Sequence, residues 1–108
     1  MDKYIIERNE YDNGKMISFQ TEESTLYVSK NKNLTFIYID NVFCQIMITT
    51  KELKLVHNKE EGHRYSIHTD NDYIRIPDSE IFWKIKDYLE LRLVNSDFDD
   101  WILQEEYQ

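Results

Sequence analysis

Apolar and polar residues alternate along the first two thirds of the chain, the pattern of strands that bury one face. In KMISFQT, Ile17 and Phe19 fall on one face of the strand, opposite Ser18 and Gln20. Turn-forming residues recur about every ten residues, a spacing typical of an antiparallel meander. These turns separate eight predicted strands, near residues 3–9, 15–21, 25–30, 34–40, 42–50, 53–57, 64–69 and 73–76.

Two stretches of this meander carry sharper predictions. Asn13-Gly14 favours a two-residue type I′ hairpin, because that turn needs positive φ at both central positions. Residues 34–48 are apolar on both faces, so their strands are expected to be the most covered of the sheet. Cys44 falls in this stretch and is interpreted as a small buried residue.

After Pro77 the apolar period changes from 2 to 3.6, which predicts an amphipathic helix over residues 78–94. Phe82, Ile85, Leu89 and Leu93 form its core-facing stripe. The opposite face is also apolar, so another segment or a partner must cover it; its apolar residues are Trp83, Leu91 and Val94.

The closing residues 95–108 supply a candidate for that cover. Ser96 and Asp99 have the spacing of a capping box, and Phe98, Trp101 and Ile102 follow at helical intervals. A short terminal helix that folds back onto residues 78–94 is therefore expected.

Together these patterns predict an α+β fold: an antiparallel meander of about seven or eight short strands, one C-terminal amphipathic helix and a short terminal helix. Residues 1–108 are expected to form a single domain, with a β-rich part over 1–77, a helix over 78–94 and an acidic aromatic segment over 95–108. The element order resembles the pleckstrin-homology-like sandwich or barrel, and a single curved sheet fits the same order. The resemblance rests on no motif and implies no functional residues.

Composition narrows the setting. No apolar run approaches the roughly 20 residues of a membrane span, and the first residues lack the pattern of a signal peptide. Cys44 is the only cysteine, which excludes an internal disulfide and indicates a cytoplasmic protein. The chain has no Ala, two Gly, one Pro and four Arg, a bias against GC-rich codons that indicates a low-GC bacterium, phage or mobile element as source.

The net charge of −8 is unevenly distributed. Residues 1–77 hold 12 acids and 10 bases, whereas residues 78–108 hold 9 acids and 3 bases. Direct nucleic-acid binding depends on Lys and Arg at phosphates, so this balance opposes it. Lysines near Tyr27 and Tyr38 could form a nucleic-acid face, but solvated edges protected by lysine give the same pattern.

Candidate catalytic chemistry is sparse. His57 and His63 could face each other across a hairpin as zinc ligands, but a polar hairpin tip is the favoured interpretation. Clustered carboxylates with a nearby lysine would suit a two-metal nuclease; the residues of this type are Glu52, Lys54, Asp70, Asp72 and Asp78. Their order along the chain is the reverse of the usual one. No nucleophile or phosphate-loop motif occurs, so an enzyme, a cofactor and a metal site are not expected.

The leading hypothesis is therefore a small acidic, non-enzymatic binding protein. Its acidic face, with one aromatic residue, would meet a basic surface of a nucleic-acid-binding enzyme or a toxin. The candidate contact residues are Asp78, Glu80, Asp87, Glu90, Asp97, Asp99, Asp100, Trp101, Glu105 and Glu106. The concrete form is an inhibitor from a phage or mobile element that imitates nucleic acid.

Two alternatives remain at this stage. An immunity protein for a basic toxin would use the same electrostatics. A pleckstrin-homology-like scaffold or homodimer would associate through Trp83, Leu91 and Trp101 instead. Neither alternative binds nucleic acid or a membrane directly.

Overall fold

The computed structural model describes residues 4–59 and 64–96 of the 108-residue chain. It shows an α+β fold in which the chain divides into two compact units, residues 1–52 and 53–108. One unit contains a five-stranded sheet and the other a four-stranded sheet with one helix. Neither sheet closes into a barrel, so the barrel form of the pleckstrin-homology-like resemblance is wrong.

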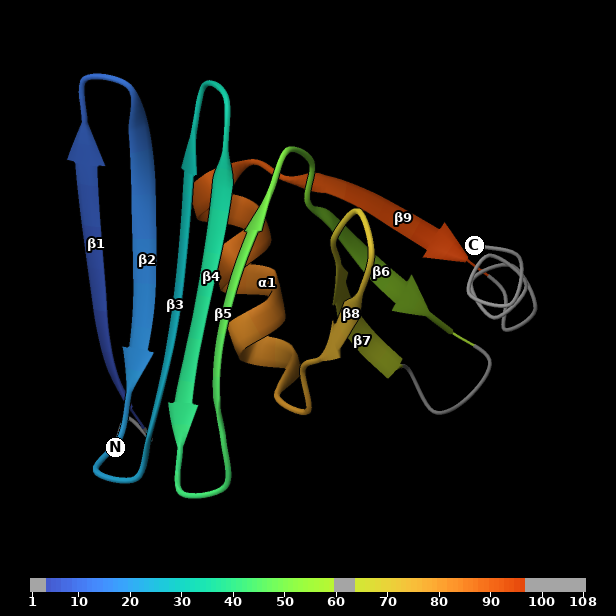
Figure 1. The fold of residues 1–108 in the computed structure, drawn as a ribbon. Coiled ribbons are helices and arrows are strands. Elements are labelled where there is room, and N and C mark those ends of the chain that lie inside the picture. The colour runs from blue at the N-terminus through green and yellow to red at the C-terminus, as the bar shows by residue number, and fades with distance from the viewer. Residues whose placement is uncertain (1–3, 60–63, 97–108) are drawn as a thin grey trace. The chain divides into compact units, whose positions relative to one another are not determined.

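The first unit is a meander in which each strand pairs antiparallel with the next one along the chain (Figure 1). Its strands are β1 (Ile5–Tyr11), β2 (Gly14–Gln20), β3 (Ser24–Asn31), β4 (Thr35–Asn41) and β5 (Gln45–Thr50). All five strands predicted here from alternation and turn spacing are confirmed, with shifts of a few residues at their ends.

The register of the meander aligns its apolar residues on one face. Ile17 on β2 pairs with Val28 on β3, which pairs with Ile37 on β4. All three side chains are fully buried. Ile48 on β5 continues the row, so period-2 alternation in four separate strands produces one continuous apolar face.

The hairpin between β1 and β2 differs from the type I′ prediction. Tyr11 pairs with Gly14, which leaves Asp12 and Asn13 as the central residues of the turn. Neither of them has positive φ, since Glu90 is the only non-glycine residue with positive φ in the described ranges. Gly14 is needed for another reason: a Cβ at this position would clash with the carbonyl oxygen of Lys30 and lie 2.9 Å from the Cα of Asn31.

The prediction that residues 34–48 are the most covered strands is wrong. β5 is an edge strand, and the side chain of Met47 in it is 69% exposed. Val42, Phe43 and Cys44 lie in the turn before β5 and are exposed, so Cys44 is not a buried residue. Residues 34–48 therefore include β4, an exposed turn and the first part of the edge strand β5. Within them, Ile37 on β4 is the fully buried apolar residue.

The second unit places its strands in the order β8-β7-β6-β9. They are β6 (Lys54–Asn58), β7 (Arg64–His68), β8 (Tyr73–Arg75) and β9 (Arg92–Ser96). β6, β7 and β8 were predicted from the sequence and pair antiparallel. β9 was not predicted and pairs parallel with β6.

The helix α1 (Ser79–Leu89) connects β8 to β9. Asp78 caps it by accepting a hydrogen bond from the backbone nitrogen of Glu80 at 2.9 Å. Phe82, Ile85 and Leu89 are buried, which confirms three members of the predicted stripe. None of the helices in the described ranges is long and apolar enough to cross a membrane.

The predicted extension of the helix to residue 94 is wrong. Glu90 adopts a left-handed conformation with φ of 53°, which ends α1 as a C-cap. Leu91 and Leu93 then alternate with the exposed Arg92, a period of 2 rather than 3.6. Pairing with β6 places Leu93 beside Leu55, so the last member of the predicted helical stripe packs in the sheet.

The short helix predicted within residues 95–108 falls almost entirely on residues 97–108, which lie outside the described ranges. Asn95 and Ser96 are the last two residues of β9. The described chain therefore contains one helix where the sequence predicted two.

Candidate protein-binding surface

Two of the acidic residues predicted as a binding face have structural roles in α1. Asp78 is the N-cap of α1, and the carboxylate of Glu80 lies 3.7 Å from the ammonium nitrogen of Lys84 one turn later. Asp87 and Glu90 are exposed. The other predicted contact residues lie outside the described ranges: Asp97, Asp99, Asp100, Trp101, Glu105 and Glu106.

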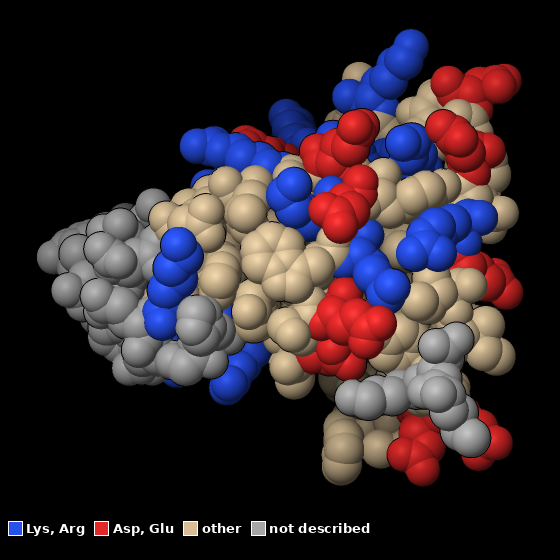
Figure 2. Space-filling view, turned by 180° about the vertical axis from the view of Figure 1, so that it is seen from behind, with Lys and Arg blue, Asp and Glu red and all other residues tan. Residues whose placement is uncertain are grey.

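The charge of the C-terminal part is therefore divided in two. Residues 78–96 carry four acids and three bases, whereas residues 97–108 carry five acids and no base. Within residues 78–96 the acids are thus nearly balanced by bases. Figure 2 shows basic and acidic side chains interspersed on the face seen there. The concentrated negative charge belongs to the sequence after β9.

The second apolar side of α1 has cover within its own unit. The ring centroid of Trp83 lies 5.7 Å from that of His57 on β6 and 6.0 Å from that of Tyr65 on β7. His57 in turn stacks on Tyr65 at 4.5 Å with nearly parallel ring planes. Leu91 is buried as well. Trp83 and Leu91 are therefore explained by packing, which weakens the case for self-association through them.

The candidate metal and nuclease residues are not brought together in the part of the chain that the structure describes. His57 is buried in the aromatic stack described above, and His63 lies outside the described ranges. Asp70 and Asp72 are exposed in the turn between β7 and β8, far along the chain from the exposed Glu52. Among residues 4–59 and 64–96, no three His, Cys, Asp or Glu side chains form a group that could hold a metal ion.

The surroundings of His68 shift its pKa. Its Nε2 lies 3.1 Å from the Oγ of Ser66, and its ring stacks on Tyr73. Burial and then the positive charge of Lys54 lower the pKa of His68 from 6.5 to about 4. The folded protein therefore keeps this ring neutral at pH values where the unfolded chain protonates it.

This shift predicts acid sensitivity. Below pH 6.5 the unfolded state binds the extra proton, so stability present at neutral pH is lost as the pH falls toward 4. After allowance for solvent screening of this half-buried ring, we expect a loss of about 1 kcal/mol between about pH 7 and pH 5. Urea unfolding at both pH values measures it. The His68→Gln variant should lose less over the same interval, and an equal loss in both proteins would contradict the assignment.

Four turns of the chain are built in the same way. A side-chain oxygen at the first position accepts hydrogen bonds from the backbone nitrogens two and three residues later. The backbone nitrogen of the first residue also donates to the carbonyl of the fourth, at 2.8 to 3.0 Å. The residues at the first position are Thr21, Asn31, Asn41 and Thr69.

The same turn carries different residues at its tip. Three of the four tips are polar: Glu22-Glu23, Lys32-Asn33 and Asp70-Asn71. The fourth is Val42-Phe43, with side chains 73% and 92% exposed. Since the turn forms around polar tips elsewhere, the fold does not require these two apolar residues, and they bury little against their own sheet.

The surroundings of Val42 and Phe43 are acidic. The turns after β2 and after β4 lie at the same end of the meander (Figure 1). We call this end the acidic–apolar end and define it by the residues Ile5, Glu22, Glu23, Asp40, Val42 and Phe43. Its described neighbours over residues 4–6, 19–26 and 39–46 include no Lys, Arg or His. Hydrogen bonds to the Asn41 side chain, at 2.8 and 2.9 Å, hold the turn that presents Phe43.

The opposite end of the meander carries the lysines. Lys15 and Lys30 are register partners there, and Lys32 and Lys51 lie in the adjoining turn and strand end. We call this the lysine end. The five-stranded sheet is thus polarised along its strands, with acids at one end and an excess of bases at the other.

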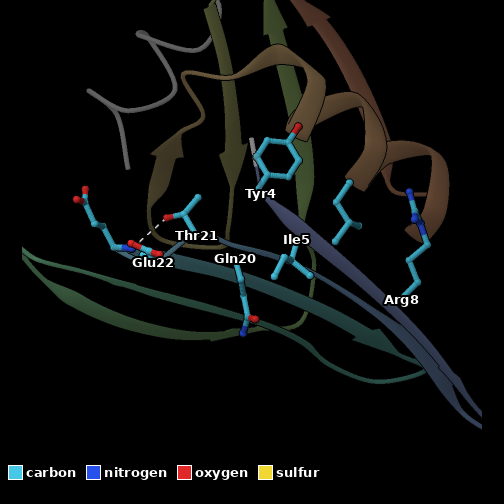
Figure 3. A pocket seen from close by; sticks show the side chains of 8 residues that line it. Tyr4, Ile5, Arg8, Gln20, Thr21 and Glu22 are labelled. Atoms are coloured by element: carbon cyan, nitrogen blue, oxygen red, sulfur yellow. Dashed lines mark hydrogen bonds between the residues drawn. The ribbon is translucent and has the colours of Figure 1, made fainter. Parts of the chain in front are cut away.

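An open hollow lies beside the acidic–apolar end, along the start of β1 and the turn after β2 (Figure 3). Its lining residues are Tyr4, Ile5, Ile6, Arg8, Gln20, Thr21, Glu22 and Glu23. Figure 3 shows the Oγ1 of Thr21 engaged by the backbone of its own turn, at 3.2 Å from the nitrogen of Glu23. The lining contains no nucleophile beside a base, so its chemistry is that of a contact surface rather than a catalytic site.

Sequence reasoning did not identify Val42 and Phe43 as surface residues. They were read as part of an apolar strand, because VFCQIMI is continuous in hydrophobicity. The signal that separates them is the ten-residue spacing of Thr21, Asn31 and Asn41, each at the first position of the same turn. That spacing places residues 42 and 43 at a tip.

Comparison with protein-family models, with curated proteins and with solved structures gives no match to this chain.

Proposed function

We propose that this protein is a non-enzymatic, cytoplasmic binding protein that docks on a basic surface of another protein through its acidic–apolar end. The observation that carries the proposal is the exposure of Phe43 at the tip of a turn whose three counterparts are polar. An exposed aromatic residue next to an aliphatic one is a suitable anchor for a protein interface, where aromatic residues are enriched at the centre.

The acidic residues at the same end of the meander as Phe43 indicate a partner with a positively charged surface. Glu22, Glu23 and Asp40 form a rim without a described base, and such a rim favours Lys- and Arg-rich surfaces. Residues 97–108 add five acids to the chain as a whole and increase long-range attraction to the same kind of partner. A nucleic-acid-binding protein has such a surface, so inhibition of one by occupation of its nucleic-acid site is the form of the proposal that we favour.

The single cysteine gives direct access to this surface. Cys44 is exposed and follows Phe43, so a benzophenone maleimide attached to it places a photo-cross-linker beside the proposed anchor. Irradiation in a lysate of the source organism, followed by mass spectrometry, should identify a basic protein. The matched control carries the label at the lysine end, in a Cys44→Ser/Leu34→Cys variant, and should not give the same product.

Affinity for the purified partner then tests the anchor. Phe43→Asn installs the residue that the Asn31 and Thr69 turns carry at the same position, so folding should be unaffected. We expect this variant to weaken binding about 30-fold, the loss of a central aromatic contact of about 2 kcal/mol. Leu34→Asn, which removes a 40% exposed side chain from the opposite end, should bind normally.

The electrostatic part has its own matched pair. Glu22→Gln/Glu23→Gln and Glu10→Gln/Asp12→Asn each remove two negative charges, the first at the acidic–apolar end and the second at the lysine end. Only the first should slow association and reduce its salt dependence. The proposal would be refuted if the two double variants had equal effects. It would also be refuted if neither salt nor Phe43→Asn changed the affinity.

A further inference from the structure

The two sheets have four edge strands within the described ranges, and they differ in how they are protected. β1 carries Glu7, Arg8 and Glu10, β8 carries Arg75 and is three residues long, and β9 begins with Arg92. β5, with the sequence QIMITT, has no charged residue, no Pro and no Gly. Charges and short length are the usual devices that keep an edge from pairing with another strand, and β5 has neither.

The turn before β5 shows which of its backbone groups point outward. The nitrogen of Asn41 donates to the carbonyl of Cys44 at 3.0 Å, so these two residues form a hydrogen-bonded pair. Such pairs alternate along an antiparallel ladder. Ile46 and Ile48 therefore bond to β4, whereas the N–H and C=O groups of Gln45, Met47 and Thr49 point to the outer edge. In the described chain no strand pairs with that edge.

We propose that two copies of the chain associate by antiparallel pairing of β5 with β5, with Met47 on the two-fold axis. In this register Met47 meets Met47 of the second copy, Gln45 meets Thr49, and Ile46 meets Ile48. Each residue whose backbone groups point outward then faces another such residue. The outward N–H and C=O groups of the two copies can therefore bond to one another. The side-chain pairs are aliphatic with aliphatic and polar with polar.

A second copy is favoured over another partner by the polarity of the sheet. Antiparallel pairing turns the second sheet end for end, so the lysine end of one copy lies beside the acidic–apolar end of the other. In the proposed register Lys51 of one copy follows its β5 toward the turn that holds Asn41 and Phe43 of the other. A two-fold contact joins the same patch of both subunits. The edge of β5 suits such a contact, because the strand is neutral and the two ends of its sheet have opposite charge.

The contact adds one strand pair, which is small for an interface, so the dimer should be weak and depend on concentration. Sedimentation velocity over a concentration series should show the wild-type chain moving from monomer to dimer. Met47→Lys places two ammonium groups together at the axis and should leave only monomer. Because Met47 is 69% exposed, this variant should fold normally, which circular dichroism checks.

Two further variants make the test specific to the strand edge. Thr49→Pro removes an outward N–H without removing a bond to β4, and it should also abolish the dimer. Tyr11→Lys introduces the same charge at a 57% exposed position of β1 and should dimerise like the wild type. Equal loss in Tyr11→Lys and Met47→Lys, or a wild-type chain that stays monomeric over the whole series, would overturn the proposal.

Cross-linking tests the register. In a Cys44→Ser background, Met47→Cys places two thiols on neighbouring strands with their Cα atoms about 5.5 Å apart. Gln45→Cys places them four residues out of step, or about 13 Å along the strands. The shortest bismaleimide should join Met47→Cys chains and leave Gln45→Cys chains single. Products from both positions at equal rate would indicate a different partner strand or register and exclude the proposed dimer.

The dimer can be tested separately from the proposed binding function. Met47→Lys should abolish dimerisation and retain the cross-link to a basic partner, whereas Phe43→Asn should do the reverse. A chain that binds its partner but never dimerises would contradict only the inference drawn from β5.

Discussion

Replacing Phe82 with Ala should lower the free energy of unfolding by about 3–5 kcal/mol, the range measured for large aromatic residues removed from cores. The side chain of Phe82 is fully buried. Its ring centroid lies 4.9 Å from that of Tyr65 and 5.0 Å from that of Trp83. The substitution therefore leaves a cavity where α1 meets its own sheet, and it removes ring contacts as well as buried area.

Urea unfolding followed by tryptophan fluorescence and by far-ultraviolet circular dichroism measures this effect. Asp87→Ala is the matched control, because it changes an exposed residue of the same helix and should alter stability by no more than about 0.5 kcal/mol. A loss below about 1 kcal/mol for Phe82→Ala would mean that α1 does not pack on β7 as described.

Replacing Gly14 with Ala should cost nearly as much, about 2–3 kcal/mol. The added Cβ would meet the carbonyl oxygen and Cα of the neighbouring strand β3, which are backbone atoms that no side-chain rotation can move aside. Accommodation requires β2 and β3 to separate at the pair Gly14–Asn31. The cost comes from this close approach, since Gly14 has no positive φ that a side chain would strain.

Asn13→Ala is the control for Gly14→Ala, since it changes the adjacent, exposed turn residue. Trp83 lies in the second unit and Trp101 follows it in the sequence, so tryptophan fluorescence reports on residues 53–108, whereas circular dichroism reports on the whole chain. If the chain is a single domain, as its sequence predicts, the two signals should change together in Gly14→Ala. A fluorescence midpoint that stays at the wild-type value while the circular dichroism midpoint falls would show two domains.

The strands β1 to β8 could be predicted because the information that defines them is local. Alternation of apolar residues and the turn residues at Thr21, Asn31, Asn41 and Thr69 lie within about ten residues of each strand they define. The buried stripe of α1 is equally local, and Phe82, Ile85 and Leu89 were identified from spacing alone.

The wrong predictions of secondary structure and burial occur where one stretch of sequence fits two patterns, or where pairing with a distant segment selects the structure. Leu89 and Leu93 fit a helical stripe, whereas Leu91 and Leu93 fit a strand alternation, and only pairing with β6, more than 30 residues earlier, selects the strand. VFCQIMI likewise fits a buried strand until the bonds of Asn41 divide it into turn and strand.

The acidic excess of the chain could be read from the sequence, whereas the position of the proposed binding surface could not. The acidic excess was read from composition and directed attention to a basic partner, which the polarised meander still favours. Composition could not show that Asp78 and Glu80 have partners on α1, or that Glu22, Glu23 and Asp40 lie at the same end of the meander as Phe43. That arrangement depends on strand register, which joins residues about 20 positions apart.

The parallel pairing of β6 with β9 has a consequence for the order of events during synthesis. Each strand of the first unit pairs with the strand made just before it, so its hairpins can close one after another as the chain emerges. The four-stranded sheet lacks its last strand until residue 96 has left the ribosome. The first unit should therefore be the earlier to protect its amides from exchange in stalled nascent chains, with the second following once residue 96 has emerged from the ribosome.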